Sequence, residues 1–115
     1  MCMFRWNMVE SVTTRGYVCW KAVGKRGHGP YWVGFEGVRT RYVAASCPPT
    51  RSNKCGWYVF ATKGSARRWA KYAEGCRRAV VPVMIRGHIV RGESIDGVGY
   101  RAEFIRRLRK GEVAR

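Results

Sequence analysis

The sequence predicts an α+β fold, in which one principal helix over residues 62–75 packs on a small, twisted and mostly antiparallel sheet. Two observations predict this class. Aromatic and β-branched residues occur in short runs that are separated by glycine and proline, as in strands. The segment SARRWAKYAEG instead repeats its apolar residues with the spacing of a helix. A chain of 115 residues buries one core, so we expect residues 1–115 to form a single domain.

The first strands are predicted in the N-terminal half. Residues 2–8 alternate between apolar and polar side chains, which is the period of a strand. VESVTTRG, residues 9–16, is interpreted as a loop, and GYVCWKAV, residues 16–23, as the next strand. GKRGHGP, residues 24–30, has the glycine and proline content of a hairpin tip, and the strand pattern resumes in residues 31–45.

A loop, a short strand and the helix follow. Residues 46–56, SCPPTRSNKCG, cannot continue a ladder because they contain two prolines and several small polar residues. Residues 57–61 form a short apolar strand. Thr62 or Ser65 caps the start of the helix, and Gly75 caps its end. The buried stripe of the helix is predicted from apolar residues at i, i+3, i+4 and i+7, namely Ala66, Trp69, Ala70 and Ala73.

The C-terminal third is predicted to be extended. Residues 78–95 form one bent strand or two strands, with the bend at Gly87. DGVG, residues 96–99, is typical of a tight turn. The final strand runs to about Arg107, and a basic C-terminal tail begins at about residue 106.

Charge is the main functional signal of the sequence. The 23 lysines and arginines exceed seven acidic residues and give a net charge of +16. Charge of this size disfavours a compact state unless an anion is nearby, and nucleic acid is the usual polyanion. We therefore expect a non-enzymatic protein that binds nucleic acid through phosphate contacts, with structured RNA preferred over DNA and a ribonucleoprotein such as the ribosome as its setting.

Two alternatives remain open. The protein is a phage- or virus-encoded inhibitor whose basic face docks on an acidic host protein that handles nucleic acid, or it is a component of a virus particle.

The basic residues gather in the helix, at its exit, in the C-terminal run and at the hairpin tip. Arginine predominates, and its planar fork binds phosphate with two hydrogen bonds. The predicted nucleic-acid-binding residues are Lys25, Arg26, Arg67, Arg68, Lys71, Arg77, Arg78, Arg101, Arg106, Arg107, Arg109 and Lys110.

Catalytic chemistry has little support in the sequence. His28 and His88 have no orienting acid in a recognisable pattern, and the cysteines have no evident histidine partner. GKRGHGP matches neither a Walker loop nor a dinucleotide-binding fingerprint in order or spacing. We therefore expect no enzymatic activity, no catalytic residue and no cofactor. The aromatic residues are expected mainly in the core, including Trp20, Trp57 and Trp69.

Five cysteines occur in the chain, and none of them forms a Cys-x-x-Cys pair, so we expect no metal site. Cys47 and Cys55 bracket the loop CPPTRSNKC. A disulfide between them would be ordinary in a hyperthermophile, whose proteins also avoid thermolabile amides as this sequence does. Buried free thiols are the alternative, and the sequence pattern favours them.

The N-terminal segment MCMFRWNMVE lacks the basic and apolar regions of a signal peptide. The longest apolar run, AVVPVMI, is too short to cross a bilayer. We therefore expect a soluble cytoplasmic protein without a membrane partner, or a component of a virus particle.

Three segments carry a resemblance to a known group. They are the Gly-Tyr strand GYVCWKAV, the strand-to-helix step GWYVFATKGSARRWA, and the closing strands VPVMIRGHIVRGESIDGVGYRAEF. Across most of residues 16–108, this layout resembles small uncharacterised α+β proteins of phages and prokaryotes. The resemblance implies a small α+β domain and an origin in a mobile element, and it implies no activity. Members often carry histidine where this chain has Tyr58.

Overall fold

The computed structural model describes residues 4–24, 33–34, 39–72 and 78–112, and these residues form six strands and one helix. The sheet is mostly antiparallel and dominates the structure, whereas the helix is short. The predicted α+β class therefore holds only in the coarse sense of a sheet with one helix. The elements in chain order are β1 (Trp6–Gly24), β2 (Val33–Gly34), β3 (Val43–Ala44), β4 (Trp57–Phe60), α1 (Lys63–Tyr72), β5 (Arg78–Ser94) and β6 (Gly97–Arg107).

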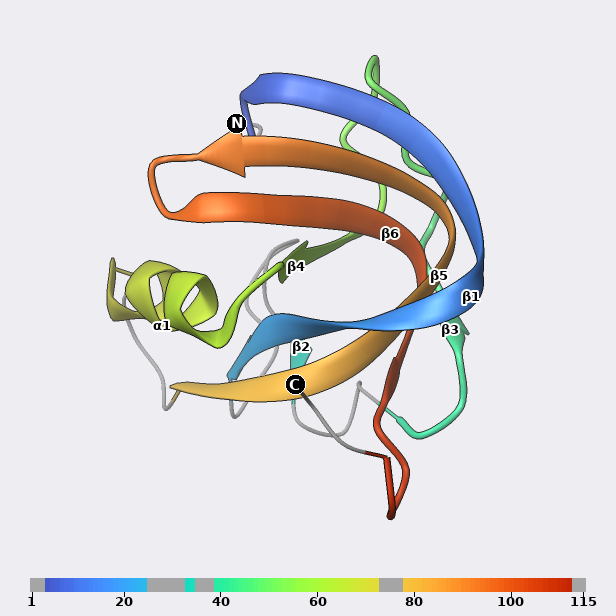
Figure 1. Ribbon diagram of the computed structural model, residues 1–115, viewed down its shortest axis with the longest axis vertical. Helices are drawn as coiled ribbons and strands as arrows, with labels where there is room; N and C mark the ends of the chain where they lie inside the picture. The colour runs from blue at the N-terminus through green and yellow to red at the C-terminus, as the bar shows by residue number, and fades with distance from the viewer. Residues whose placement is uncertain (1–3, 25–32, 35–38, 73–77, 113–115) are drawn as a thin grey trace.

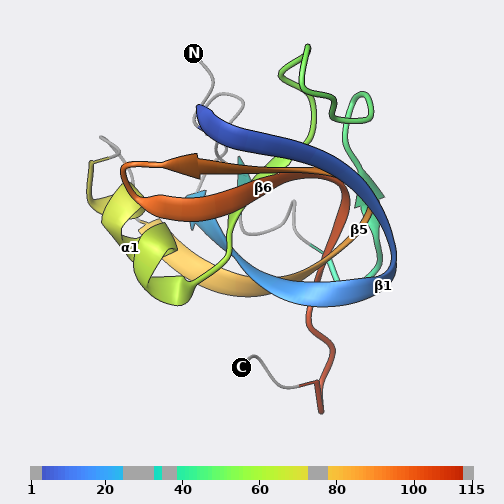
Figure 2. The same ribbon diagram turned by 45° about the horizontal axis from the view of Figure 1, so that its top comes forward.

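The strands close into a ring, which is seen most directly in Figure 1. β1 pairs with β5, β5 with β6, and β6 with β4, all in antiparallel order, and β4 returns to β1 through the pair Trp20–Phe60. β3 extends β6, and β2 lies parallel to the end of β1. The long strands β1 and β5 bend across the molecule, so that α1 lies beside one end of the ring (Figures 1 and 2).

A bulge at Gly87 bends β5. Gly87 and His88 together oppose Glu103 of β6, where the register between the two strands shifts. The φ angle of Gly87 is 86°, which side-chain-bearing residues rarely adopt, and a Cβ there would lie 2.6 Å from Glu103 Oε1. The carboxylate of Glu103 accepts the backbone N–H of His88 at 3.0 Å. The predicted bend is therefore confirmed, and it lies within one continuous strand.

Two groups of buried side chains form the core. The larger group comes from β1, β4, β5 and β6, and it consists of Cys19, Val23, Val59, Val83, Ile85, Ile89, Ala102 and Ile105. The second group lies where α1 packs on the sheet, and it consists of Phe4, Tyr58, Phe60 and Ala66. Trp57 packs against the first group, and Trp20 and Trp69 pack against the second, as expected for core aromatics.

The prediction of a loop at residues 9–16 is wrong, because these residues belong to β1. The register of β1 against β5 shifts twice in this region, which interrupts the alternation of side chains. Side chains here are exposed on both faces of the strand, and they include Val9 and Val12. A strand that buries neither face has no period-two hydrophobic pattern, so this part of β1 could not be recognised from hydrophobic periodicity.

The predicted strand pattern over residues 31–45 is only partly present. Strand occurs at β2 and β3, whereas residues 39–42 belong to no strand. The predicted loop at residues 46–56 and the strand that follows it are confirmed. The hairpin tip expected in GKRGHGP lies outside the described residues, apart from Gly24 at the end of β1.

The predicted closing hairpin is present, but its turn is shorter than the predicted residues 96–99, because residues 97–99 already belong to β6. Ile95 and Asp96 form the turn between β5 and β6, and Gly97 follows with a φ angle of 121°. β6 ends at Arg107 as predicted. The following residues to 112 form no strand or helix and contain one turn, which is where the basic tail was expected.

Candidate functional site

Helix α1 begins at a side-chain cap. The Thr62 hydroxyl accepts the backbone N–H of Ser65 at 3.1 Å, so Thr62 is the N-cap of the two candidates. Ala66 and Ala70 are buried against the sheet, and the ring of Trp69 lies 6.1 Å from that of Phe60. These three residues confirm the predicted apolar stripe. Ala73 and Gly75, the predicted end of the stripe and the C-terminal cap, lie outside the described residues.

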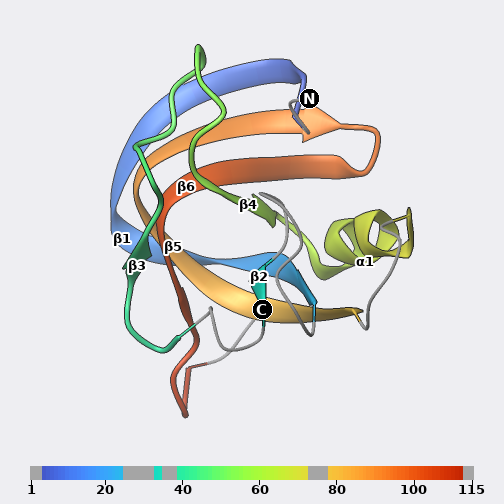
Figure 3. The ribbon, with the colours of Figure 1, turned by 180° about the vertical axis from the view of Figure 1, so that it is seen from behind.

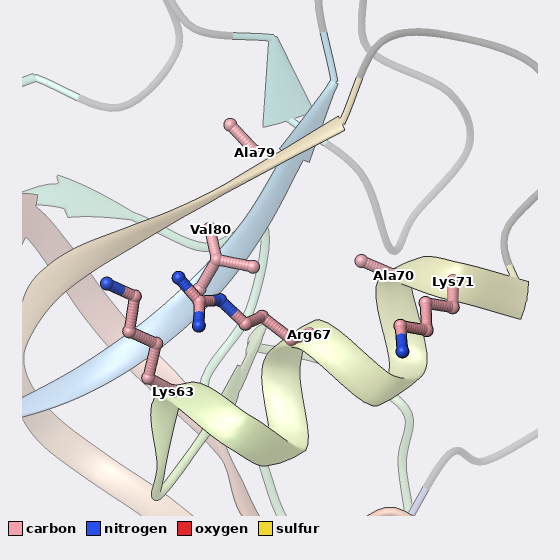
Figure 4. Close-up of a pocket in the computed structure, with 6 residues that line it drawn as sticks. All are labelled: Lys63, Arg67, Ala70, Lys71, Ala79 and Val80. Carbon is pink, nitrogen blue, oxygen red and sulfur yellow. The ribbon is translucent and has the colours of Figure 1, made fainter.

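One flank of α1, next to the buried stripe on the side of Ala70, carries three cations at four-residue intervals, Lys63, Arg67 and Lys71, which we call the basic face. All three side chains are exposed, and they line a pocket of about 390 Å³ between α1 and the start of β5. The remaining lining comes from Ala70, Ala79 and Val80. In Figure 4, the Lys63 and Arg67 side chains turn toward the end of the pocket at Val80, and Lys71 lies further along the helix. The helix periodicity thus directs its charges onto a concavity.

The electrostatics of the basic face favour an anion. Among the described residues, no ion pair involves Lys63 or Arg67. The Lys63 ammonium lies 5.2 Å from the centre of the Trp20 ring, whose π face attracts a cation. Like charges four residues apart on a helix repel each other by a few tenths of a kcal/mol, about 0.2–0.5 kcal/mol per pair. A bound anion would attract each of these cations and so offset the repulsion between them.

Two other pockets among the described residues lack this lining. A pocket of about 230 Å³ beside β4 contains one cation, Lys54. A pocket of about 440 Å³ between β1 and the loop 46–56 is lined partly by Glu10 and His88, and it contains no lysine or arginine. The pocket at the basic face is therefore the best anion site among the three.

Arg68 lies on a different flank of α1 from the basic face. Its guanidinium donates to the Ser65 hydroxyl at 3.1 Å and to the carbonyl of Asp96 at 2.9 Å. These bonds tie the helix to the turn of the β5–β6 hairpin. These bonds engage one nitrogen of an exposed guanidinium, so the phosphate contact predicted for Arg68 stays a prediction.

Arg101 is a clear correction to the predicted site. Its side chain is 1% exposed, because the loop over residues 46–56 covers it. The guanidinium donates to the carbonyls of Thr50 at 2.7 Å, Asn53 at 2.8 Å and Cys55 at 3.0 Å. The prediction of a phosphate contact at Arg101 is wrong, since its hydrogen bonds hold the loop on the sheet.

Arg106 is also buried, with 7% of its surface exposed. It forms a two-pronged ion pair with Glu112, with contacts of 2.6 and 2.8 Å, and its guanidinium lies 5.3 Å from the ring centre of Tyr42. The hydrogen bond to Glu112 raises the pKa of Arg106, and the same contact lowers the pKa of Glu112 to about 2. Arg106 therefore ties the segment that contains Glu112 to the end of β6, and it is too buried to contact a phosphate.

The rest of the C-terminal run lies away from α1. Arg107 is half-buried and donates its backbone N–H to the carbonyl of Arg39, whereas Arg109 and Lys110 are exposed. Figures 1 and 3 show this segment below the ring and α1 beside it, so the two basic regions form no single surface. Lys25, Arg26 and Arg77 lie outside the described residues, and only the backbone of Arg78 is described.

Sequence reasoning missed Lys63 and the apolar floor of the pocket. Lys63 lies one helical repeat before Arg67, and extending the i, i+4 series backwards from Lys71 would have found it. Ala79 and Val80 gave no signal, because a strand that follows the helix in sequence does not show which helix face it adjoins.

The structure joins Cys47 and Cys55 in a disulfide, with the two Cα atoms 5.5 Å apart. It is the alternative that the sequence pattern favoured less. The bridge closes the loop whose carbonyls hold Arg101. Cys19 is a buried free thiol, and burial raises its pKa to about 12. No three histidine, cysteine or acidic side chains of the described part gather to hold a metal ion.

None of the helical segments in the described ranges has the length and apolar character needed to span a bilayer. Comparison of the chain with protein-family models, with curated protein sequences and with solved structures gives no match. The resemblance to small phage and prokaryotic proteins therefore stays a prediction. The geometry of the basic face is the observation on which a functional proposal must rest.

Proposed function

We propose that the protein is a non-enzymatic nucleic-acid-binding protein, which holds phosphates at the basic face formed by Lys63, Arg67 and Lys71. Structured RNA, within a ribonucleoprotein such as the ribosome, is the preferred ligand. The observation that carries the proposal is that these three cations line one pocket. The net charge of +16 adds a long-range attraction that draws any polyanion toward the surface.

The chemistry of the site supports contacts with the backbone of the nucleic acid. Lysine and arginine on the exposed face of a helix bind phosphate oxygens through charge-assisted hydrogen bonds. Such contacts position a nucleic acid without reading its bases. RNA that is folded on itself suits this mode, since its double-stranded parts are recognised mainly through shape, phosphates and 2′-hydroxyls.

A salt titration tests the proposal. Binding of a fluorescently labelled RNA hairpin would be measured by anisotropy between 50 and 200 mM NaCl. We expect the logarithm of the binding constant to fall linearly with the logarithm of the salt concentration, by about 0.7–0.9 for each phosphate contacted. The triple variant Lys63→Gln/Arg67→Gln/Lys71→Gln should bind at least tenfold more weakly at 100 mM NaCl, with a slope reduced by roughly two units.

A matched control separates the basic face from net charge. Arg15→Gln/Arg51→Gln/Lys54→Gln removes the same charge at exposed positions away from α1. This control should lose much less affinity than the first triple variant. Equal losses in the two variants would contradict the proposal, and so would a flat response to salt. A DNA hairpin of the same sequence tests the preference for RNA, which predicts weaker binding of the DNA.

The alternative of an acidic protein partner makes a different prediction. Such a partner would remain bound after nuclease treatment, and the purified protein would not bind the RNA hairpin at 50 mM NaCl. That pair of results would replace the proposal with the inhibitor hypothesis.

A further inference from the structure

We infer that the pocket between α1 and β5 binds one unpaired nucleotide, with the base on the apolar floor of the pocket and the phosphate at its cationic rim. The inference rests on the proposed function, and it adds which part of a nucleic acid enters the site.

The lining of the pocket combines two chemistries. Ala70, Ala79 and Val80 form an apolar floor, in which Ala70 is buried and the two strand residues are half-buried. Lys63 and Arg67 stand at the rim, and both turn toward Val80 (Figure 4). A phosphate group gains nothing from an alkyl floor, because its oxygens need hydrogen-bond donors. The flat face of a base gains by leaving water there, so the pair of chemistries matches a whole nucleotide.

The volume of the pocket restricts the size of the ligand that it can hold. Its volume of about 390 Å³ falls at the lower end of the range of roughly 300–1,000 Å³ that is typical of small-ligand sites. One nucleotide fits such a space, and a duplex does not. Bases inside a duplex are stacked and paired, so they reach the floor of a pocket only when they are unpaired or turned out of the helix.

Lys63 and Arg67 are suited to different parts of the same ligand. The guanidinium of Arg67 is planar, so it offers a face on which a base can stack and an edge that donates to phosphate. The ammonium of Lys63 lies 5.2 Å from the centre of the Trp20 ring, and this attraction keeps it at the rim. Trp20 is thus a positioning residue for Lys63.

The spacing of the three cations supports a strand that continues past the pocket. Residues four apart on a helix are separated by about 6 Å along its axis, which is close to the distance between successive phosphates of one strand. When one phosphate lies at the rim, a neighbouring phosphate of the same strand comes within reach of the next cation. A single-stranded segment that runs along α1 therefore meets the whole basic face.

The test compares two RNA hairpins that differ only in a short 3′ single-stranded overhang. Wild-type protein should bind the hairpin with the overhang at least tenfold more tightly than the blunt hairpin. Val80→Phe fills the pocket and leaves every cation in place, so it should abolish this preference and leave the affinity for the blunt hairpin and the salt slope unchanged. Val80→Ala is the matched control, and it should keep the preference.

A second measurement covers the case in which Val80→Phe does not fold, as judged by circular dichroism. The overhang would carry 2-aminopurine, whose fluorescence reports the stacking of that base. Titration with wild-type protein should change this fluorescence at the overhang, and the same base within the stem should show no change. Equal affinity for both hairpins together with an unchanged signal would overturn the inference.

The same measurements distinguish failure of the nucleotide site from failure of nucleic-acid binding. If the protein binds both hairpins with the predicted salt dependence but without preference, the proposed function stands and the inference fails. If it binds neither hairpin, both fail. A 5′-mononucleotide distinguishes the source of the ligand: a strand end is supported when the mononucleotide competes only at much higher concentration, and a free nucleotide is the ligand when it competes at the same concentration as the overhang.

Discussion

Arg101 shows that an arginine within a basic run can have a structural role in this chain. A guanidinium within a basic run suggests a phosphate contact, but here three backbone carbonyls receive its hydrogen bonds beneath a loop. The sequence could not show this, because a strand position facing away from the main core is exposed or buried according to whether a distant loop covers it. Lys63 shows the converse, because its position in the helix series was readable and was overlooked.

Lys21 is a buried lysine with a consequence for stability. It is 1% exposed, and burial lowers its pKa from 10.5 to about 7. Between pH 7 and 10.5 the unfolded chain therefore binds a proton that the folded protein has released, so the free energy of unfolding rises with pH in this window. Above pH 9 the buried thiol of Cys19 acts in the opposite direction, because its pKa is raised to about 12.

We predict that the melting temperature of the wild-type protein rises between pH 7 and 9. Lys21→Met should melt at a higher temperature than the wild type at pH 6, and the difference should shrink as the pH approaches 9. Thermal melts followed by circular dichroism measure both effects. Lys54→Met, at an exposed position, is the control. A difference that stays constant across the pH range would contradict this account of Lys21.

At the scale of elements, α1 and the β5–β6 hairpin were the most predictable parts. The Thr62 cap, the apolar stripe and the glycines that follow Asp96 are local signals, and they correctly predicted the start of the helix and the presence of the hairpin. The stretch of β1 over residues 9–16 was not predictable, since its side chains are exposed on both faces and its register shifts. Only part of the pocket could be predicted. Its cations follow the helix period, but its floor includes residues of β5, whose position beside α1 is set by tertiary packing.

The loop over residues 46–56 depends on its disulfide. The bridge joins two cysteines that are eight residues apart in sequence. Closing such a loop contributes about 2–3 kcal/mol to the free energy of unfolding, because it restricts the unfolded chain. We predict that Cys47→Ser/Cys55→Ser lowers the free energy of unfolding by about this amount, measured by urea denaturation. Reductant should destabilise the wild type and leave the double variant unchanged. If reductant affected both proteins equally, the bridge would not be the source of the effect.

At the scale of the whole molecule, charge and fold are in tension. A net charge of +16 on one small domain produces self-repulsion that the seven acidic residues cannot offset. The total charge was readable from composition alone, but the separation of the α1 cations from the C-terminal cations was not, because it depends on where the C-terminal segment lies.

We predict that salt stabilises the free protein and weakens its binding to RNA. The screening length falls from about 30 Å at 0.01 M salt to about 10 Å at 0.1 M, so repulsion between distant cations weakens. The melting temperature should therefore rise as NaCl increases from 10 to 150 mM. The variant Lys63→Gln/Arg67→Gln/Lys71→Gln should show a smaller rise because it carries fewer positive charges. A melting temperature that fell with salt would refute the idea that repulsion limits stability.

The closure of the ring has one more consequence. Among the described residues, β4 is joined to β1 by the single pair Trp20–Phe60, whereas β1 and β5 are paired along most of their length. Separating β4 from β1 thus disrupts far less backbone pairing than separating any other two long neighbours. Since α1 follows β4 after two residues, and Trp20 also attracts Lys63, this sparsely paired contact between β4 and β1 lies near the pocket. A ligand bound in that pocket should therefore slow the transient opening between β4 and β1 first. The pairing between the other long strands should change little.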